Sequence, residues 1–166
     1  MQPTGSITYT SPNFSGFTLS AQGNNQTTDY TDADKKAAKL KKSSGYSLSY
    51  ATGGLSVSYA SNTEDTQKAI NGIGASYDFG MAKVFLSSLT QSGAKDATGY
   101  GISVPFGATT LIASGSSKGD EQNYELVAKY NLSKRTLVYF QNTNKDSGKV
   151  NTSAVSTNSI GLSHSF

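Results

Sequence analysis

The sequence predicts an all-β protein, an antiparallel up-and-down β-barrel that crosses a membrane with its strands. The first observation is a period of two: along many short segments, apolar and aromatic residues alternate with Ser, Thr, Gly, Ala, Gln and Asn. The second is that short and long connections alternate between these segments. A wall inside a membrane must be apolar only on its outer face, and its turns are short at one end. We expect residues 1–166 to form a single domain of this kind.

Eleven segments have strand patterning, and turn residues bound each of them. In the segment 122–132, for example, Tyr124 and Leu126 occupy alternate positions. The segments 82–90 and 109–116 contain continuous apolar runs, so their facing stays open and a β-bulge could lie in either. The expected strands are residues 5–11, 16–22, 45–51, 54–61, 71–79, 82–90, 98–106, 109–116, 122–132, 135–142 and 158–166.

The connections between the expected strands alternate in length. The short ones are residues 12–15, 52–53, 80–81, 107–108 and 133–134, and the longer ones are 23–44, 62–70, 91–97, 117–121 and 143–157. This alternation of short and long connections is expected for a meander in which every strand crosses a membrane. A β-sandwich does not require such an alternation. A transmembrane helix is excluded, because no run of about 18 apolar residues exists.

Aromatic residues gather at the ends of the expected strands. Tyr and Phe are typical of the headgroup layer, which accepts an apolar ring with a polar edge. Tyr46 and Tyr100 lie nearer the long loops and would form the opposite girdle. The aromatic residues near the short turns are Phe14, Phe17, Tyr50, Tyr77, Phe79, Phe106, Tyr130 and Phe166.

The last eight residues, 159–166, have strand patterning up to the chain terminus. Ile160, Leu162, His164 and Phe166 fall on one face and small polar residues on the other. A soluble protein seldom ends on an exposed aromatic residue, because terminal residues usually fray. A terminal strand that pairs with neighbours inside a lipid wall avoids this problem.

Several motifs resemble one family, the Gram-negative general porins of beta-proteobacterial type. Residues 161–166 (GLSHSF) are similar to the C-terminal Gly-x-x-His-x-Phe signal of these porins, and residues 7–17 (ITYTSPNFSGF) resemble one of their hairpins. Residues 130–136 (YNLSKRT) and 74–80 (GASYDFG) are similar to two further hairpins. The resemblance extends over nearly the whole chain and corresponds to the C-terminal two-thirds of the family's sixteen-stranded barrel.

This resemblance implies a passive diffusion channel for small hydrophilic solutes and ions in the outer membrane. It also implies a trimer, contact with lipopolysaccharide and other outer-membrane lipids, and a periplasmic C-terminus. In the family the terminal strand is recognised by the barrel-assembly machinery, so Gly161, Leu162, His164 and Phe166 are the expected assembly signal. The family's first five strands and its inward-folded third loop have no counterpart in this sequence.

The sequence is compatible with two ways of closing the barrel. Open sheet edges cannot be satisfied in hydrocarbon, so the wall must close. Eleven antiparallel strands would make the first and last strands parallel. Either the segment 5–11 stays outside and ten strands close, or the chain is a truncated porin whose edges pair with missing strands or another chain.

Four residues are expected to line the pore. Glu125 and Lys129 alternate with the apolar face of their strand, and Tyr139 and Gln141 do the same on the next strand. A charge on the lipid side would cost about 2–4 kcal/mol at the midplane, which favours the inward assignment. Because Lys83, Lys134 and Arg135 add positive charge near the short turns, and because rings of Lys or Arg favour anions, we expect a mild anion preference.

The net charge is +3, and lysines cluster in the longest expected loop. A solvated external loop is the main interpretation, with attraction of lipopolysaccharide phosphate or anions as the alternative. Nucleic-acid binding is not expected, because only Tyr30 provides an aromatic ring near the basic residues. The clustered residues are Lys35, Lys36, Lys39, Lys41 and Lys42.

The sequence contains no combination of residues typical of an enzyme or a metal site. There are no cysteines, and His164 is the only histidine. Ser163 lies on the opposite face of its strand from His164, and no Asp completes a triad. We therefore expect no enzymatic activity, no cofactor and no metal. The alternative to a channel is a non-conducting β-barrel or a β-protein used for adhesion or surface structure.

Overall fold

The computed structural model describes residues 5–27, 40–64, 67–148 and 153–165. Within these ranges eleven strands form one antiparallel sheet, and their order in the sheet is their order in the chain. The strands are β1 (Gly5–Thr10), β2 (Phe17–Thr27), β3 (Leu40–Thr52), β4 (Leu55–Glu64), β5 (Ile70–Asp78), β6 (Lys83–Gln91), β7 (Ala97–Phe106), β8 (Thr109–Lys118), β9 (Glu121–Asn131), β10 (Thr136–Asp146) and β11 (Val155–His164).

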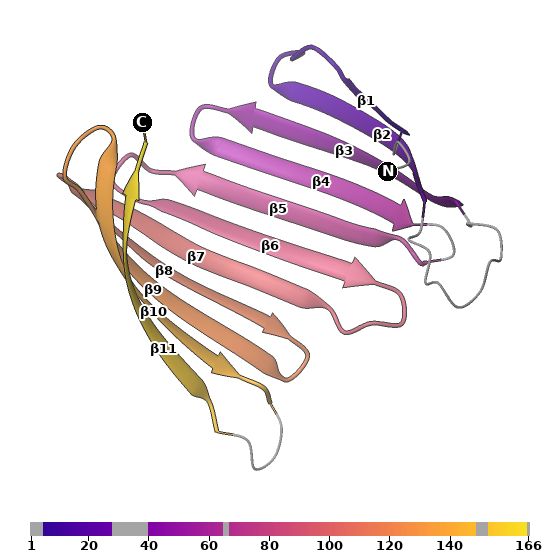
Figure 1. Cartoon of the computed structure of the whole chain (residues 1–166). Helices are drawn as coiled ribbons and strands as arrows, with labels where there is room; N and C mark the ends of the chain where they lie inside the picture. The colour runs from indigo at the N-terminus through magenta and orange to yellow at the C-terminus, as the bar shows by residue number, and fades with distance from the viewer. Residues whose placement is uncertain (1–4, 28–39, 65–66, 149–152, 166) are drawn as a thin grey trace.

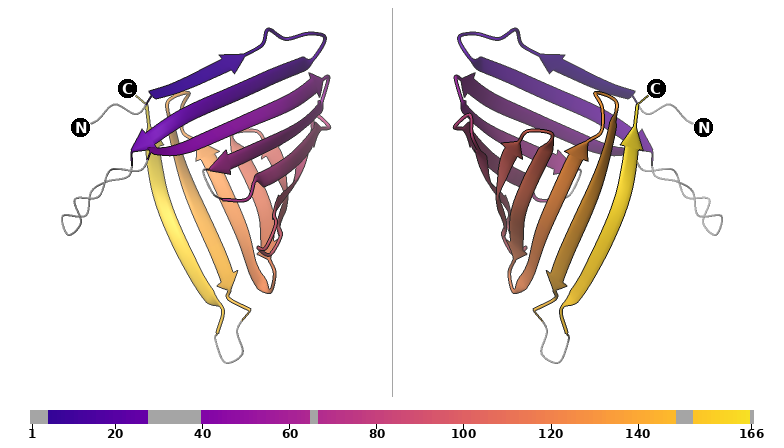
Figure 2. Two further views of the ribbon diagram at one scale, coloured as in Figure 1. Left: turned by 90° about the vertical axis from the view of Figure 1, so that its right-hand side faces the viewer. Right: turned by 90° about the vertical axis from the view of Figure 1, so that its left-hand side faces the viewer.

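The sheet curves into an open trough, with β1 at one edge and β11 at the other (Figures 1 and 2). No ladder joins either edge to another described strand, and β1 pairs with β2 over its full length. The alternative in which residues 5–11 stay outside a closed ten-stranded barrel is therefore wrong. Because every neighbour pair is antiparallel, β1 and β11 run in the same direction.

The ladders assign the side chains to two faces, because residues paired in register lie on the same side of a sheet. Leu19, Leu48 and Tyr59 pair across β2, β3 and β4 on what we call the apolar face. Ser20 and Ser47 pair on the opposite side, which we call the polar face. Among the described residues Val127 is the only buried hydrophobic residue. The described strands thus form a sheet one layer thick, and no other described residues cover its apolar face.

The two strands with continuous apolar runs have ordinary registers. β6 pairs with β5 and β7, and β8 with β7 and β9, without an extra residue on either side. Neither β6 nor β8 therefore contains a bulge. Val84 pairs with Tyr77 and Ile102 on the apolar face, so Phe85, the next residue of β6, belongs to the polar face.

Rings on some strands cover glycines on the neighbouring strand. The Tyr139 ring lies over Gly161, its partner across β10 and β11, and the Phe85 ring lies over Gly101 across β6 and β7. A Cβ atom at Gly161 would come within 2.5 Å of Tyr139 Cε1. These glycines are therefore required for close approach of the ring.

Short turns and longer connections lie at opposite ends of the strands, as the sequence predicts (Figure 1). Most strand ends differ from the predicted ones, because strands such as β2, β3 and β10 extend by several residues into the expected long loops. Lys41 and Lys42 belong to β3 rather than to the loop, while Lys35, Lys36 and Lys39 lie outside the described residues. The connection expected at 117–121 is only the two residues Gly119 and Asp120, and Gly119 has a φ of 61°. Within the described ranges no helix is long and apolar enough to cross a membrane.

Candidate functional site

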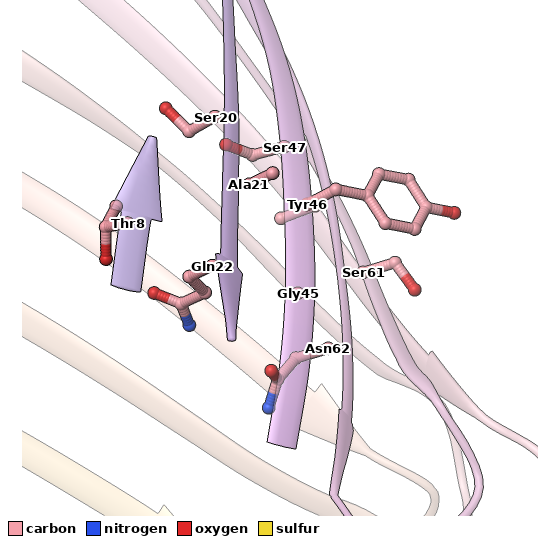
Figure 3. Close-up of a pocket in the computed structure, with 10 residues that line it drawn as sticks. Thr8, Ser20, Ala21, Gln22, Gly45, Tyr46, Ser47, Ser61 and Asn62 are labelled. Atoms are coloured by element: carbon pink, nitrogen blue, oxygen red, sulfur yellow. The ribbon is translucent and has the colours of Figure 1, made fainter. Parts of the chain in front are cut away.

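The candidate site is the polar face of the sheet, which lies on the inside of the trough. In Figure 3 the side chains of Thr8, Ser20 and Gln22 point to the side on which the far strands are drawn, and the Tyr46 ring points away. From β1 to β4 this face carries mainly hydroxyl and carboxamide groups. Such a surface can exchange hydrogen bonds with water and with polar solutes.

The four predicted pore-lining residues come together on the polar face of β9 and β10. Lys129 pairs with Tyr139, and Gln141 pairs with Val127, two residues along β9 from Lys129. The Gln141 Nε2 group donates to Glu125 Oε2 at 3.2 Å and to Thr143 Oγ1 at 3.3 Å. Within the described part of the chain the only salt bridge is elsewhere, so the Lys129 ammonium has no carboxylate partner there.

Sequence reasoning missed several apolar side chains on the polar face, three of which lie on β5 and β6. Phe85, Leu89 and Ile70 are aligned with polar-face residues by the ladders of β5 and β6. Their own segments contain apolar residues at both parities, so periodicity could not assign them. The only available signal was the glycine content of the neighbouring strands, since Gly72 lies opposite Leu89 and Gly101 opposite Phe85.

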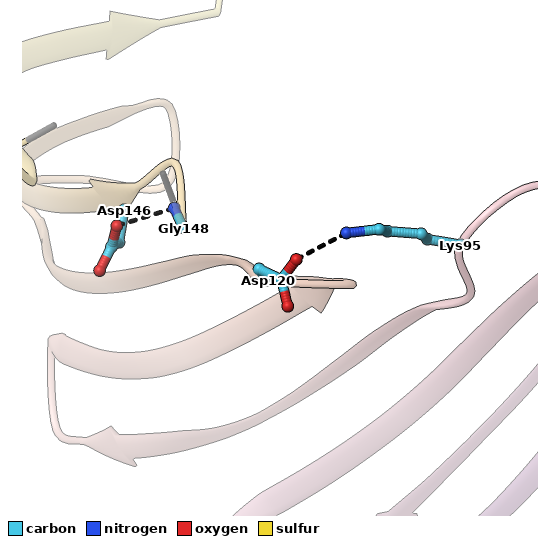
Figure 4. A network of polar contacts seen from close by, with 4 residues as sticks. All are labelled: Lys95, Asp120, Asp146 and Gly148. Atoms are coloured by element: carbon cyan, nitrogen blue, oxygen red, sulfur yellow. Dashed lines mark hydrogen bonds and ion pairs between the residues drawn. The ribbon is translucent and has the colours of Figure 1, made fainter. Parts of the chain in front are cut away.

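Two separate polar contacts involve residues at the long-loop end of the sheet (Figure 4). Lys95 Nζ lies 2.6 Å from Asp120 Oδ2, and Asp146 Oδ1 accepts a hydrogen bond of 2.9 Å from the Gly148 amide. The hydrogen bond and charge of Lys95 lower the pKa of the Asp120 carboxyl, and the Asp120 carboxylate raises the pKa of Lys95 in the same way. This pair ties the connection between β6 and β7 to the one between β8 and β9.

The predicted assembly signal lies mostly on the last strand. Leu162 pairs with Val138 on the apolar face, and Gly161 lies on the polar face under Tyr139. His164 is on the apolar side, with its Nδ1 atom 2.8 Å from Thr136 Oγ1. Phe166 lies outside the described residues. In the described ranges no group of three or more His, Asp or Glu residues could hold a metal ion.

A one-layer antiparallel sheet with an uncovered apolar face and a polar concave face is the wall of a membrane β-barrel. Residues 1–149 match the model of a family described as Gram-negative porin. Because this match covers most of the sequence, the chain belongs to the Gram-negative porin family. The terminal stretch 159–166, which carries part of the resemblance, lies beyond the matched residues.

Solved structures of porins have the same fold. An engineered triple mutant of Rhodopseudomonas blastica porin superposes with a TM-score of 0.77 at 20% identity, over 98% of this chain and 55% of that chain. An anion-selective porin from Comamonas acidovorans gives a TM-score of 0.61 at 21% identity, over 97% of this chain and 59% of that chain. The chain therefore spans little more than half the length of these porins. No curated protein sequence matches it.

Proposed function

We propose that this sheet forms part of the wall of an outer-membrane channel through which small hydrophilic solutes and ions diffuse passively. The observation that carries the proposal is the division of the sheet into two faces. Large apolar side chains such as Ile73, Leu86 and Leu126 are exposed on the apolar face, which suits lipid. Hydroxyl, amide and charged groups predominate on the concave face, which suits a water-filled lumen. Family membership agrees with the expectation that the chain is not an enzyme.

Closure of this wall requires strands beyond the eleven of the sheet. The backbone groups at the edges of β1 and β11 must be paired in hydrocarbon. Since β1 and β11 run in the same direction, only an odd number of inserted strands lets every neighbour pair be antiparallel. The five further strands that the family resemblance implies would meet this requirement, whether they come from the same polypeptide or from another chain.

We assign the predicted pore-lining roles to Glu125, Lys129, Tyr139 and Gln141, with a mild preference for anions. Lys129 has no described carboxylate partner, so its charge would act fully on passing ions. Lys83, Lys134 and Arg135 at the short-turn end would add to the positive potential. Glu125 opposes them, which is why the expected preference is mild. The description of the Comamonas acidovorans porin as anion-selective supports this direction.

The test is the reversal potential of the protein in a planar bilayer under a KCl gradient. The parent should conduct in discrete steps and show a reversal potential of the sign expected for anions, and Lys129→Glu should shift it toward cations. Lys42→Glu is the matched control, since it makes the same change of charge on the apolar side of β3. A parent without conductance steps would favour the non-conducting barrel, and equal shifts for both variants would refute the role of Lys129.

The proposal includes the partners of the family. The end of β11 lies at the short-turn end, because His164 pairs with Thr136 directly after the connection from β9 to β10. We therefore place the C-terminus in the periplasm, where Gly161, Leu162, His164 and Phe166 would be read by the barrel-assembly machinery. The long-loop end would face lipopolysaccharide, and the complete channel would assemble as a trimer.

A further inference from the structure

A shallow hollow lies on the polar face where β2, β3 and β4 meet (Figure 3). Gly45 stands in register between Gln22 and Asn62, so two carboxamides flank a position without a side chain. A Cβ atom at Gly45 would lie 3.0 Å from Asn62 Oδ1 and 3.6 Å from Gln22 Cγ. The hydroxyl groups around this position belong to Thr8, Ser20 and Ser47.

The polar groups of the hollow have free hydrogen-bonding capacity. Ser20 Oγ bonds to Thr10 Oγ1 at 3.1 Å, but Thr8, Gln22, Ser47 and Asn62 make no side-chain hydrogen bond with any described residue. Each carboxamide offers two donors and an acceptor, and each hydroxyl both donates and accepts. All these groups are neutral. The hollow can therefore meet a ligand that presents several donors and acceptors without charge.

An apolar surface formed by Ile70 and Leu89 adjoins the hollow on the same face. Ile70 pairs with Asn62, and Leu89 pairs with Gly72, the polar-face residue two positions along β5 from Ile70. Their side chains are 45% and 52% exposed, although they lie on the concave polar face, where exposed apolar area has no lipid to cover it. The polar face thus combines uncharged hydrogen-bonding groups with an adjacent apolar surface.

We propose that this surface is a binding subsite for neutral saccharides in the channel wall. A sugar ring has hydroxyl groups along its edge, which match the amide and hydroxyl groups of the hollow. It also has C–H groups on its faces, which match the apolar surface of Ile70 and Leu89. The hollow measures about 220 Å³, below the ~300–1,000 Å³ of sites for drug-sized ligands. It therefore suits one sugar ring at a time. The inference rests on the proposed assignment of the polar face to the lumen, and it adds a substrate class.

The experiment measures binding of methyl β-D-glucopyranoside to the refolded chain in dimethyldodecylamine oxide micelles, by saturation-transfer difference NMR. This detergent has no sugar headgroup and does not compete. The parent should give a saturable signal from the ring protons. Gln22→Leu and Asn62→Leu should each weaken binding about three- to tenfold through loss of a hydrogen-bonding partner. Leu89→Ser should weaken it through loss of apolar contact.

The matched control is Asn123→Leu, which removes a polar-face carboxamide on β9 outside the hollow. Its affinity should equal that of the parent. An absent signal, or equal weakening by all the variants, would overturn the inference. Tighter binding of glucose 6-phosphate than of the neutral glucoside would overturn the neutral class of ligand. Because the measurement needs no conduction, a conducting protein without sugar binding would refute only this inference and leave the channel intact.

Discussion

Replacement of Gly161 by alanine tests the contact that holds the last strand against β10. The new Cβ atom would lie 2.5 Å from Tyr139 Cε1, whereas carbon atoms prefer separations of about 3.5–4.0 Å. The ring must therefore move by about 1 Å, and overpacking of this size costs about 1–3 kcal/mol. Alanine also gains about 0.4–1 kcal/mol by restricting the unfolded chain. We expect a net loss of about 1–2 kcal/mol in the free energy of unfolding.

Gly74→Ala is the matched control, because its Cβ atom would meet nothing closer than Ser58 Oγ at 3.4 Å. It should be neutral or slightly stabilising. In a Tyr139→Ala background the penalty of Gly161→Ala should disappear, which gives a coupling energy within the range of about 0.5–3 kcal/mol for residues in contact. The assay is urea unfolding in lipid vesicles, followed by circular dichroism. Equal effects at Gly74 and Gly161, or additivity with Tyr139→Ala, would refute the argument.

Three further predictions concern the rim, the terminus and the lipid face. The Lys95–Asp120 link should be complete at neutral pH. It should be lost as pH falls from the ordinary Asp value of about 3.9 through the lowered pKa of Asp120; lower hydrogen-exchange protection factors in residues 92–96 at pH 2 than at pH 7, each relative to the intrinsic exchange rate at that pH and reproduced by Asp120→Asn at pH 7, would show this. Deletion of Phe166 should block insertion into the outer membrane of cells while expression continues, and normal insertion would mean an ordinary strand. Leu126→Lys should cost about 2–4 kcal/mol in vesicles if it lies near the midplane, whereas Glu125→Lys should cost little; equal costs would contradict the assigned faces.

The facing of most strands could be predicted because their alternation is unbroken. On β9 the sequence alone separates Leu126 from Glu125 and Lys129, and the ladders agree. Around Phe85 the sequence alone could not assign side chains to the two faces, because apolar residues occupy consecutive positions. There the ladders place Val84 opposite Tyr77 and leave Phe85 to cover Gly101. Strand pairing, a long-range property, decides such positions.

The same limit applies to the functional site. The charged pair Glu125 and Lys129 is visible within one strand, since spacing along the chain fixes its face. The hollow between Gln22, Gly45 and Asn62 depends on the registers of three strands. A shift of one register by a single residue would move its members to the other face. Local patterning therefore predicted the wall, and only the register revealed the neutral site within it.

The central claim is that alternate residues of one strand face water and lipid, and single-cysteine labelling on β9 tests it most directly. The chain has no cysteine of its own, so each variant carries one defined thiol. In vesicles, cysteines at the lumen positions Glu125 and Lys129 should react with a membrane-impermeant maleimide, while those at Leu126 and Ala128 should not. Equal reactivity at all four positions, or the opposite alternation, would contradict the account.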